Sequence, residues 1–318
     1  PIYHKFMEIS YRVADKVCLI TPARFLFNAG ATPKEFNTAR LNDKHFKVVY
    51  YEQDSAKVFP NTDIKGGVAV TYRDVDQNFG SIETYISIPE VRNICKKVDE
   101  IRVDSLSGII SGRGVYRFTD IALKERPEIE DIQSKGHKWD VGTGVFKLFD
   151  AILFFDEKPQ GEGFIKILGL SENSRKYMWV DSRFINKPGN LNKYKVILPK
   201  ANGSGAIGEV LSTPLIGTPL IGFTETFISI GEFDELTEAE NCLKYVKSKF
   251  CRVMLGVLKI TQDNTRDKWA KVPMQDFTSA SDVPWQKPIP EIDRYFYQKY
   301  GLSQEEIDFI ETNVKPMD

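Results

Sequence analysis

The order of predicted elements in the first 75 residues limits most strongly the folds open to this chain. An amphipathic helix is predicted from Tyr3 to Asp15, and the next segment, KVCLITP, reads as a buried strand that ends at Pro22. A second helix is predicted in TPKEFNTARLND, and two strands follow in FKVVYYEQD and GGVAVTYRD. This order is typical of the back end of an α/β sheet, because a complete doubly wound domain needs further βα units. The sequence therefore predicts a partial, Rossmann-like sheet in residues 1–85.

The first residues indicate how such a partial sheet arises. The chain begins with Pro1, and the helical pattern starts in the first turn of PIYHKFMEIS. We therefore expect the chain to be a piece of a longer polypeptide whose preceding part supplies the front half of the sheet. A sheet without that half exposes an edge that should be paired with another strand.

The remaining residues predict a different architecture. A helix in SIPEVRNICKKVDE opens a charged connector over residues 86–140. Residues 141–318 are predicted to form a mixed α+β domain that is closed by C-terminal helices. Its strand candidates, separated by Gly, Pro and Asn turns, are AILFFDEKP, GFIKILGL, YMWVD, YKVILPK and GFTETFISIG.

Helix signals dominate the end of the chain. The strongest pattern is a single helix in TEAENCLKYVKSKFCRVMLGVLKIT, with Thr237 as its cap and Glu240 at the capping-box position. Two shorter helices are predicted in IPEIDRYFYQKYG and SQEEIDFIETNVK, and Ser303 caps the second of these.

Composition and missing motifs exclude several classes of function. Net charge is −1, so a nucleic-acid surface has to come from local clustering of basic residues. The four cysteines have neither metal-site nor disulfide-framework spacing, and with only three histidines we expect no metal. Reduced thiols, no membrane span and no signal peptide predict a cytoplasmic location. No P-loop, zinc-protease motif or Ser-centred elbow is present, so we expect no catalytic residue in this chain. The Gly-rich segments DVGTGVF and ANGSGAIGE are predicted to be tight turns.

Two groups of segments resemble one known family. YHKFMEISYRVADKVCLITPARFLFNAG and FPNTDIKGGVAVTY resemble the part that follows the catalytic motif in gamma-class N6-adenine DNA methyltransferases of restriction–modification systems. KYKVILPKANGSG, AENCLKYVKSKFCRVML and VPMQDFTSASDVPW resemble the target recognition domain of the same family.

This resemblance implies a DNA-binding role and an incomplete enzyme. The family transfers a methyl group from S-adenosylmethionine to adenine in double-stranded DNA. Its Gly-rich cofactor loop and its Asn/Asp-Pro-Pro-Tyr/Phe motif are absent from this chain. We therefore expect the fragment alone to bind no cofactor and to be inactive. The implied partners are double-stranded DNA, the upstream catalytic half and, in a fused enzyme, a nuclease or helicase.

The resemblance also implies a role for Phe59. Enzymes that modify a base within a duplex swing it into a pocket and hold it there with aromatic contacts. Phe59 matches the aromatic residue that packs on the flipped adenine in the family. Pro60 would fix the direction of this loop, and Gly66 and Gly67 would allow close approach of the backbone. The alternative is that Phe59 only seals the edge of the sheet.

Candidate DNA contacts fall in four places. The strongest helix and the segment after it contain the main excess of basic residues, which are predicted to contact phosphates: Lys244, Lys247, Lys249, Arg252, Lys259 and Arg266. In PKANGSG, the side chains of Lys200, Asn202 and Ser204 suit base reading, whereas an ordinary hairpin turn is the alternative. Arg24 follows a strand end and either faces DNA or braces the catalytic loop. The segments GFTETF and SGRGVYR are weaker candidates and equally suit plain surface loops.

Two other functions stay open at this point. The chain could be a stand-alone DNA-specificity or scaffold module that has no enzymatic part. It could also be an interaction module that binds no nucleic acid, because its net charge is near zero and aromatic residues make up 12% of the chain.

Overall fold

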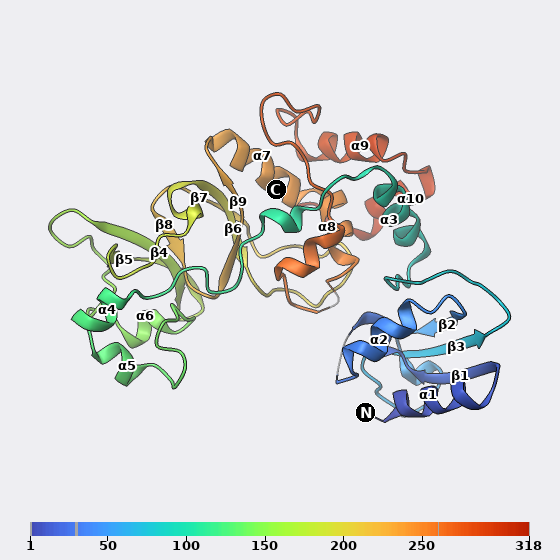
Figure 1. Ribbon diagram of the computed structural model, residues 1–318. Coiled ribbons are helices and arrows are strands. Elements are labelled where there is room, and N and C mark those ends of the chain that lie inside the picture. Colours follow the sequence, from blue (N-terminus) through green and yellow to red (C-terminus); the bar gives the residue numbers. More distant parts are fainter. Residues whose placement is uncertain (1, 29–30, 260, 318) are drawn as a thin grey trace. The chain divides into compact units, whose positions relative to one another are not determined.

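The chain folds into two compact units, Pro1–Arg92 and Asn93–Asp318, in a computed structural model (Figure 1). The structure describes residues 2–28, 31–259 and 261–317. Helix α3 (Pro89–Ile101), which the sequence predicts, leads from the first unit into the second.

The first unit has the element order that the sequence predicts. Its elements are α1 (Tyr3–Val13), β1 (Lys16–Pro22), the 3₁₀ turn η1 (Ala23–Phe27), α2 (Lys34–Leu41), β2 (Phe46–Glu52), the 3₁₀ turn η2 (Ser55–Lys57) and β3 (Val68–Asp74). The strands form one sheet in the order β1–β3–β2, and β3 runs antiparallel to both neighbours. Strands β1 and β2 are therefore parallel to each other without touching. The mixed α/β character is confirmed, whereas the doubly wound arrangement stays a prediction.

Aromatic side chains hold this small unit together. Phe25 from η1 packs edge-on against Phe36 of α2 and Phe46 of β2, with ring centroids 5.8 and 6.2 Å apart. Met7 of α1 joins the same buried cluster. Because α1 buries Met7, it contributes one apolar face to the core.

A second apolar face of α1 is exposed, and β1 and β2 are both edge strands of the sheet. Four apolar side chains recur at helical spacing and are each more than half exposed: Ile2, Phe6, Ile9 and Val13. Strand β1 pairs with β3 and with no other strand in the described residues, and its Ile20 is also more than half exposed. The first unit thus presents an apolar helix face and an unpaired strand edge to its surroundings.

The second unit combines short strands with helices at both ends. Its first elements are η3 (Leu106–Ile109), α4 (Asp120–Glu125), α5 (Glu128–Ile132), α6 (Val145–Leu148), β4 (Phe164–Ser171), β5 (Ser174–Asp181) and η4 (Gly189–Asn192). The following ones are β6 (Tyr194–Pro199), β7 (Leu215–Gly217), β8 (Ile221–Phe223), β9 (Phe227–Phe233), α7 (Leu236–Lys247), α8 (Lys249–Gly256), η5 (Arg266–Lys271), α9 (Ile289–Lys299) and α10 (Gln304–Asn313).

Two three-stranded sheets form the middle of this unit, in the orders β5–β4–β8 and β7–β6–β9. Tyr116, Phe118 and Ile129, from the stretch predicted as a connector, are buried in the same core cluster as residues of β4 and β5. This stretch therefore belongs to the core of the second unit. The division of the chain by function stays a prediction.

Two local predictions were wrong. The predicted helix from Thr237 onward is two helices, because Ser248 takes an extended backbone conformation between α7 and α8. The Ser248 hydroxyl then caps α8 by accepting the N–H of Cys251 at 3.1 Å, and α7 is capped by Glu235 instead of Thr237. The segment AILFFDEKP forms turns with isolated bridges, since Ala151 has a positive φ of 55° and interrupts the extended backbone.

The two terminal helices were predicted correctly. Helix α10 begins after Ser303, whose hydroxyl accepts the N–H of Glu306 while the Glu306 carboxylate accepts the N–H of Ser303. Helix α9 buries Phe296 against Tyr245 and Phe250, with ring centroids 5.2 Å apart in both pairs. The closing helices therefore form an aromatic core with α7 and α8.

Candidate nucleic-acid interface

Phe59 lies in the loop that joins β2 to β3 in the first unit. Its side chain is 41% exposed. Its backbone N–H donates to the carbonyl of Ser55 at 2.8 Å, and the chain then turns through Pro60 and Asn61, which has a φ of 65°. The loop therefore holds an accessible aromatic ring in a defined turn.

The buried residue Ser55 stabilises this turn through hydrogen bonds. The Ser55 hydroxyl donates to the carbonyl of Thr62 at 3.1 Å and accepts the N–H of Ile64 at 2.8 Å. The Thr62 hydroxyl donates to the carbonyl of Phe59 itself at 2.7 Å. Because Ser55 bonds the Phe59 N–H through its backbone carbonyl and the far side of the turn through its hydroxyl, Phe59 is positioned before any ligand arrives.

Arg24 braces the far end of the same loop. Its Nε donates to the carbonyl of Lys65 at 2.6 Å. A Cβ on Gly66 would lie 2.9 Å from Arg24 Cγ, and one on Gly67 would lie 2.3 Å from the carbonyl oxygen of Glu52. Both glycines have positive φ, so the pair is required by close packing of the chain on itself. This hydrogen bond ties Arg24 to the Phe59 loop, and its two predicted roles, facing DNA or bracing the catalytic loop, stay predictions.

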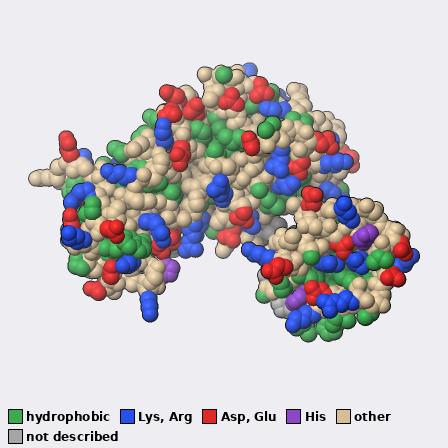
Figure 2. All heavy atoms as spheres, in the orientation of Figure 1, with side chains coloured by type: hydrophobic (Ala, Val, Ile, Leu, Met, Phe, Trp, Pro, Cys, Tyr) green, Lys and Arg blue, Asp and Glu red, His purple; other side chains and the backbone are tan. Residues whose placement is uncertain are grey.

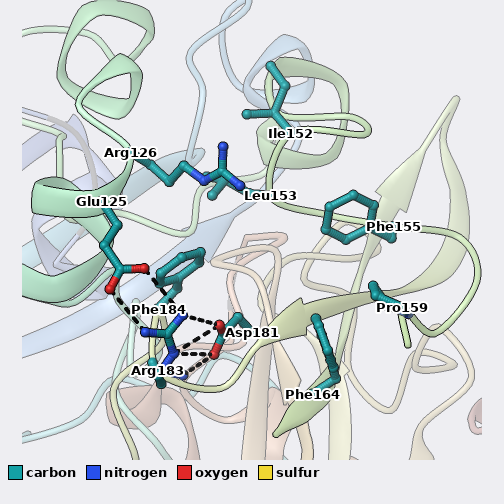
Figure 3. Close-up of a pocket in the computed structure, with 10 residues that line it drawn as sticks. All are labelled: Glu125, Arg126, Ile152, Leu153, Phe155, Pro159, Phe164, Asp181, Arg183 and Phe184. Carbon is teal, nitrogen blue, oxygen red and sulfur yellow. Dashed lines mark hydrogen bonds and ion pairs between the residues drawn. The ribbon is translucent and has the colours of Figure 1, made fainter. Parts of the chain in front are cut away.

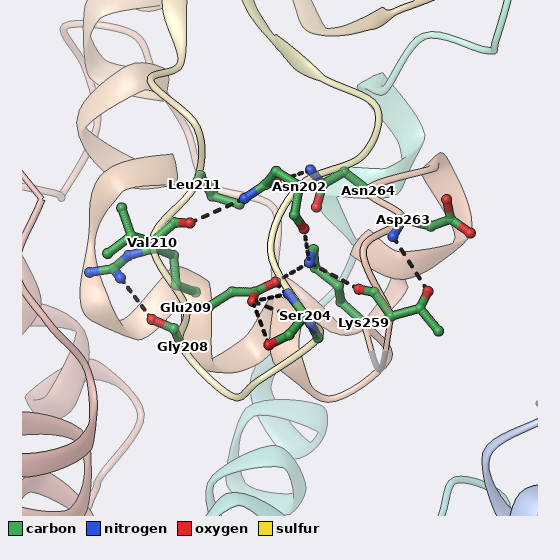
Figure 4. A network of polar contacts seen from close by, with 12 residues as sticks. Asn202, Ser204, Gly208, Glu209, Val210, Leu211, Lys259, Asp263 and Asn264 are labelled. Carbon is green, nitrogen blue, oxygen red and sulfur yellow. Dashed lines mark hydrogen bonds and ion pairs between the residues drawn. The ribbon is translucent and has the colours of Figure 1, made fainter. Parts of the chain in front are cut away.

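The loop after β6 is held by a buried ion pair (Figure 4). Lys259 is 1% exposed, and its ammonium group binds the Glu209 carboxylate and donates to the carbonyls of Asn202 and Thr261 at 2.8 and 3.0 Å. Burial raises the pKa of Glu209, but hydrogen bonds from Lys259 and from the N–H groups of Ser204 and Gly205 outweigh it, so the pKa is lowered. These contacts fix the loop internally.

The same contacts occupy the predicted base-reading side chains. Asn202 donates through Nδ2 to the carbonyl of Val210 at 3.1 Å, and its Oδ1 accepts from Asn264. The hydroxyl of Ser204 donates to the Glu209 carboxylate at 3.4 Å. Lys200 is half-buried at the start of the loop. Base reading by Asn202 or Ser204 would require these internal bonds to break.

The basic residues of α7 and α8 differ in their access to solvent. Arg252 is 1% exposed and donates to the carbonyls of Lys247, Gly208 and Lys315 at 3.2, 2.8 and 2.6 Å, so its donors serve the fold. Lys249 is paired with Glu311 at 2.5 Å. Phosphate contact by Arg252 is not possible in this conformation.

Lys244 and Lys247 line a hollow of about 520 Å³ between α7 and the start of α9. Gln286 and Lys287 line it as well. Sequence reasoning missed these two residues because they follow α7 by some 40 positions in the chain. Three lysines, Lys244, Lys247 and Lys287, therefore line this hollow, which makes it the most basic of the described hollows in the helical region.

Arg266 lines a second hollow, of about 500 Å³, together with Arg113. Its Nε donates to the carbonyl of Ser107 at 2.8 Å. On the face seen in Figure 2, basic and acidic side chains alternate over both units.

A third hollow is a poor anion site (Figure 3). It measures about 450 Å³ and is lined by Phe155, Phe164 and Arg183, among others. Arg183 is already bound to Asp181 at 2.7 Å and to Glu125 at 3.0 Å. Its charge is thus neutralised within the protein.

The described residues contain no group of three or more His, Cys, Asp or Glu that could hold a metal ion. Among the helices that the structure describes, none is long and apolar enough to cross a membrane.

Comparison with known proteins relates the N-terminal part of the chain to one family. Residues 1–59, which end at the exposed phenylalanine, match the model of the family described as Eco57I restriction-modification methylase. The chain is thus related through this segment to restriction–modification methylases. No curated protein matches the sequence.

Eighteen chains of solved structure match the fold. One of them is described as the type IIG restriction endonuclease BpuSI, with 11% sequence identity and a TM-score of 0.36. The match covers 98% of this chain and 48% of that one, so this chain spans about half the length of its structural match.

Proposed function

We propose that this chain is the DNA-recognition part of an N6-adenine DNA methyltransferase from a restriction–modification system. The observation that carries the proposal is the Phe59 loop. It presents an exposed aromatic ring on a hydrogen-bonded turn, next to a segment that matches a restriction–modification methylase family. In the proposal, Phe59 stacks on an adenine that has been swung out of the duplex.

The first unit requires a partner, and the upstream catalytic half of the same polypeptide fits it. An unpaired strand edge is a template for another strand, and an exposed apolar helix face loses stability unless it is covered. β1 and α1 offer both features side by side in sequence. A preceding sheet segment that pairs with β1 and packs on Phe6 and Ile9 would satisfy both.

Methyl transfer is assigned to that upstream half together with its cofactor, S-adenosylmethionine. The Gly66–Gly67 turn of the Phe59 loop does not form a cofactor cradle, because the space at these glycines is filled by Arg24 and by the backbone at Glu52. In the proposal, this chain's own residues position the DNA and hold the extruded base. The chain alone binds DNA without modifying it, and any fused nuclease or helicase lies elsewhere in the polypeptide.

The second unit is proposed to grip the duplex. Lys244, Lys247 and Lys287 line one hollow, and Arg266 lines another. These lysines and Arg266 can neutralise phosphates, so no phosphate contact has to be assigned to the buried Arg252 and Lys259. Lys200 stays a candidate because its side chain is part-exposed.

Binding to duplex DNA should therefore be strongly salt-dependent. Affinity should fall steeply between about 50 mM and about 200 mM salt, since each neutralised phosphate releases counterions. Lys244→Gln should flatten the slope of log affinity against log salt by about 0.9. Fluorescence anisotropy with a labelled duplex measures both. Lys193→Gln is the control, because Lys193 is already paired with Asp234. No binding at either salt concentration would overturn the proposal.

Phe59→Ala should weaken binding to a duplex that carries a mismatched adenine. A mismatched base leaves the stack easily, and its stacking on an aromatic ring is worth about 1–3 kcal/mol. Phe59→Tyr should retain the affinity, because the ring is kept. Tyr50→Ala is a matched control, since Tyr50 is an exposed aromatic residue of the same unit. Equal affinities for all variants would favour a ring that only seals the sheet edge.

A further inference from the structure

Three loops that are far apart in the sequence meet at the end of strand β6. The N–H of Glu225 donates to the carbonyl of Val141 at 2.9 Å, and the N–H of Lys200 donates to the carbonyl of Thr226 at 2.9 Å. The Thr226 hydroxyl donates to that of Thr143 at 3.1 Å. Segments 140–144, 199–202 and 222–227 are therefore bonded to one another.

A fourth loop, residues 111–114, joins them through a salt bridge. Arg113 Nη2 donates to Glu225 Oε2 at 3.0 Å. We call Arg113, Thr143, Lys200, Glu225 and Thr226 the four-loop surface. It unites the segments SGRG, DVGTG, PKAN and GFTETF, which as separate sequences read equally well as surface turns.

The Arg113–Glu225 pair is asymmetric. The Arg113 side chain is 61% exposed, whereas that of Glu225 is only 12% exposed. Glu225 is also confined, because a Cβ on Gly114 would lie 2.8 Å from its Oε1. Since the carboxylate is held by its surroundings, it fixes one side of the guanidinium. In the described residues, the remaining N–H groups of Arg113 make no hydrogen bond.

The Arg113–Glu225 ion pair contributes little to the stability of the fold. An ion pair with one largely exposed partner contributes little to folding, and placing a carboxylate in a confined site carries a desolvation cost. What the arrangement does provide is an arginine with a fixed orientation and free donors. A fixed guanidinium fork is suited to planar, two-point recognition.

The neighbouring charge decides which DNA group this arginine fits. A phosphate placed on Arg113 would lie close to the Glu225 carboxylate and be repelled by it. The major-groove edge of guanine is neutral and offers two acceptors, O6 and N7, to a guanidinium. Arg266 lines the same hollow and donates to the carbonyls of Ser107 and Gly108. The neighbouring Asp267 is paired with Lys268, so Arg266 is better placed for a phosphate.

We propose that Arg113, held in place by Glu225, reads a guanine in the major groove of the target site. This inference rests on the proposed DNA-binding function and names a specificity residue within it. Thr143 and Thr226 supply hydroxyls next to the reading position, and Arg266 anchors the adjacent backbone.

The test is a selection from randomised duplex DNA with the full chain and four variants, followed by sequencing of the bound fraction. The wild type should enrich a motif with guanine at one position. Arg113→Ala should lose about 10- to 100-fold of the guanine preference at that position alone. Arg113→Lys should lose the same preference while keeping the charge, and Glu225→Gln should weaken it in part. Arg183→Ala is the matched control, because Arg183 is a similarly exposed arginine that is paired with Asp181 away from this surface, and it should keep the motif.

The outcomes separate this inference from the function on which it rests. An unchanged motif for Arg113→Ala would overturn the inference and leave DNA recognition intact. A uniform loss of affinity with a flatter salt slope would also overturn it, because that result marks a phosphate contact. A wild-type chain that selects no motif would overturn the proposed function and this inference together. Retained tryptophan fluorescence in each variant confirms folding of the second unit, which contains all four tryptophans.

Discussion

Replacing Glu209 with glutamine should lower the free energy of unfolding of the second unit by about 3 kcal/mol. Glutamine keeps the shape of the side chain but removes the charge that compensates Lys259, which is 1% exposed. A buried ammonium group with only carbonyl partners is costly, so the loop from Ala201 to Glu209 should loosen as well.

Chemical denaturation followed by tryptophan fluorescence measures this change, because all four tryptophans lie in the second unit. Asp234→Asn is the control: it breaks the exposed pair with Lys193 and should change little. The difference between wild type and Glu209→Gln should shrink in acid. Because the folded-state pKa of Glu209 is lowered, its stabilisation is present above the unfolded pKa and is lost as pH falls through the folded one. A pH-independent difference would contradict an ionic role.

Arg252→Ala should destabilise the second unit by about 3–5 kcal/mol. The substitution leaves three backbone carbonyls without their donor and opens a cavity in the core between α8 and the C-terminal segment. Because the guanidinium is buried, DNA affinity per folded molecule should not change. This expectation replaces the phosphate contact that the sequence alone predicts for Arg252.

Denaturation curves and DNA titrations on the same preparation separate these two effects. Arg183→Ala is a suitable control, since Arg183 makes several hydrogen bonds to carboxylates but is largely exposed, and its loss should leave stability close to that of the wild type. Normal stability combined with lost DNA affinity in Arg252→Ala would instead place this arginine at the interface.

The sequence predicts the fold well where the determining signals are local. Hydrophobic period, Pro22 and the Ser303 capping box mark elements that the structure confirms. The break at Ser248 has no such signal, because the apolar stripe continues from α7 into α8. A serine that takes extended backbone and caps α8 is favoured by packing with α9, whose Asp293 accepts the N–H groups of Lys249 and Phe250. That packing depends on residues more than 40 positions away.

At the candidate interface too, the sequence does not predict features that depend on packing between distant segments. Lys244, Lys259 and Arg252 look alike in the sequence, but burial separates them. Lys259 and Arg252 are buried by the loop of residues 200–209, which precedes them by about 50 positions. The role proposed for Phe59 comes from the family resemblance of its segment, because its Phe-Pro turn alone equally suits a ring that seals the sheet edge. The pairing of Arg113 with Glu225 spans 112 positions and could not be predicted from either segment.

Under the proposed function, the composition of the four-loop surface determines how the protein can change its DNA target in evolution. Its loops are spread from Arg113 to Thr226, with core strands between them. Exchange of one short segment with a relative by recombination would join loops that were not selected together. Productive crossovers should therefore fall outside this span, so that all four loops are inherited as a block. Single substitutions at an exposed tip such as Arg113 can act alone, because the buried supports beneath it are unaffected.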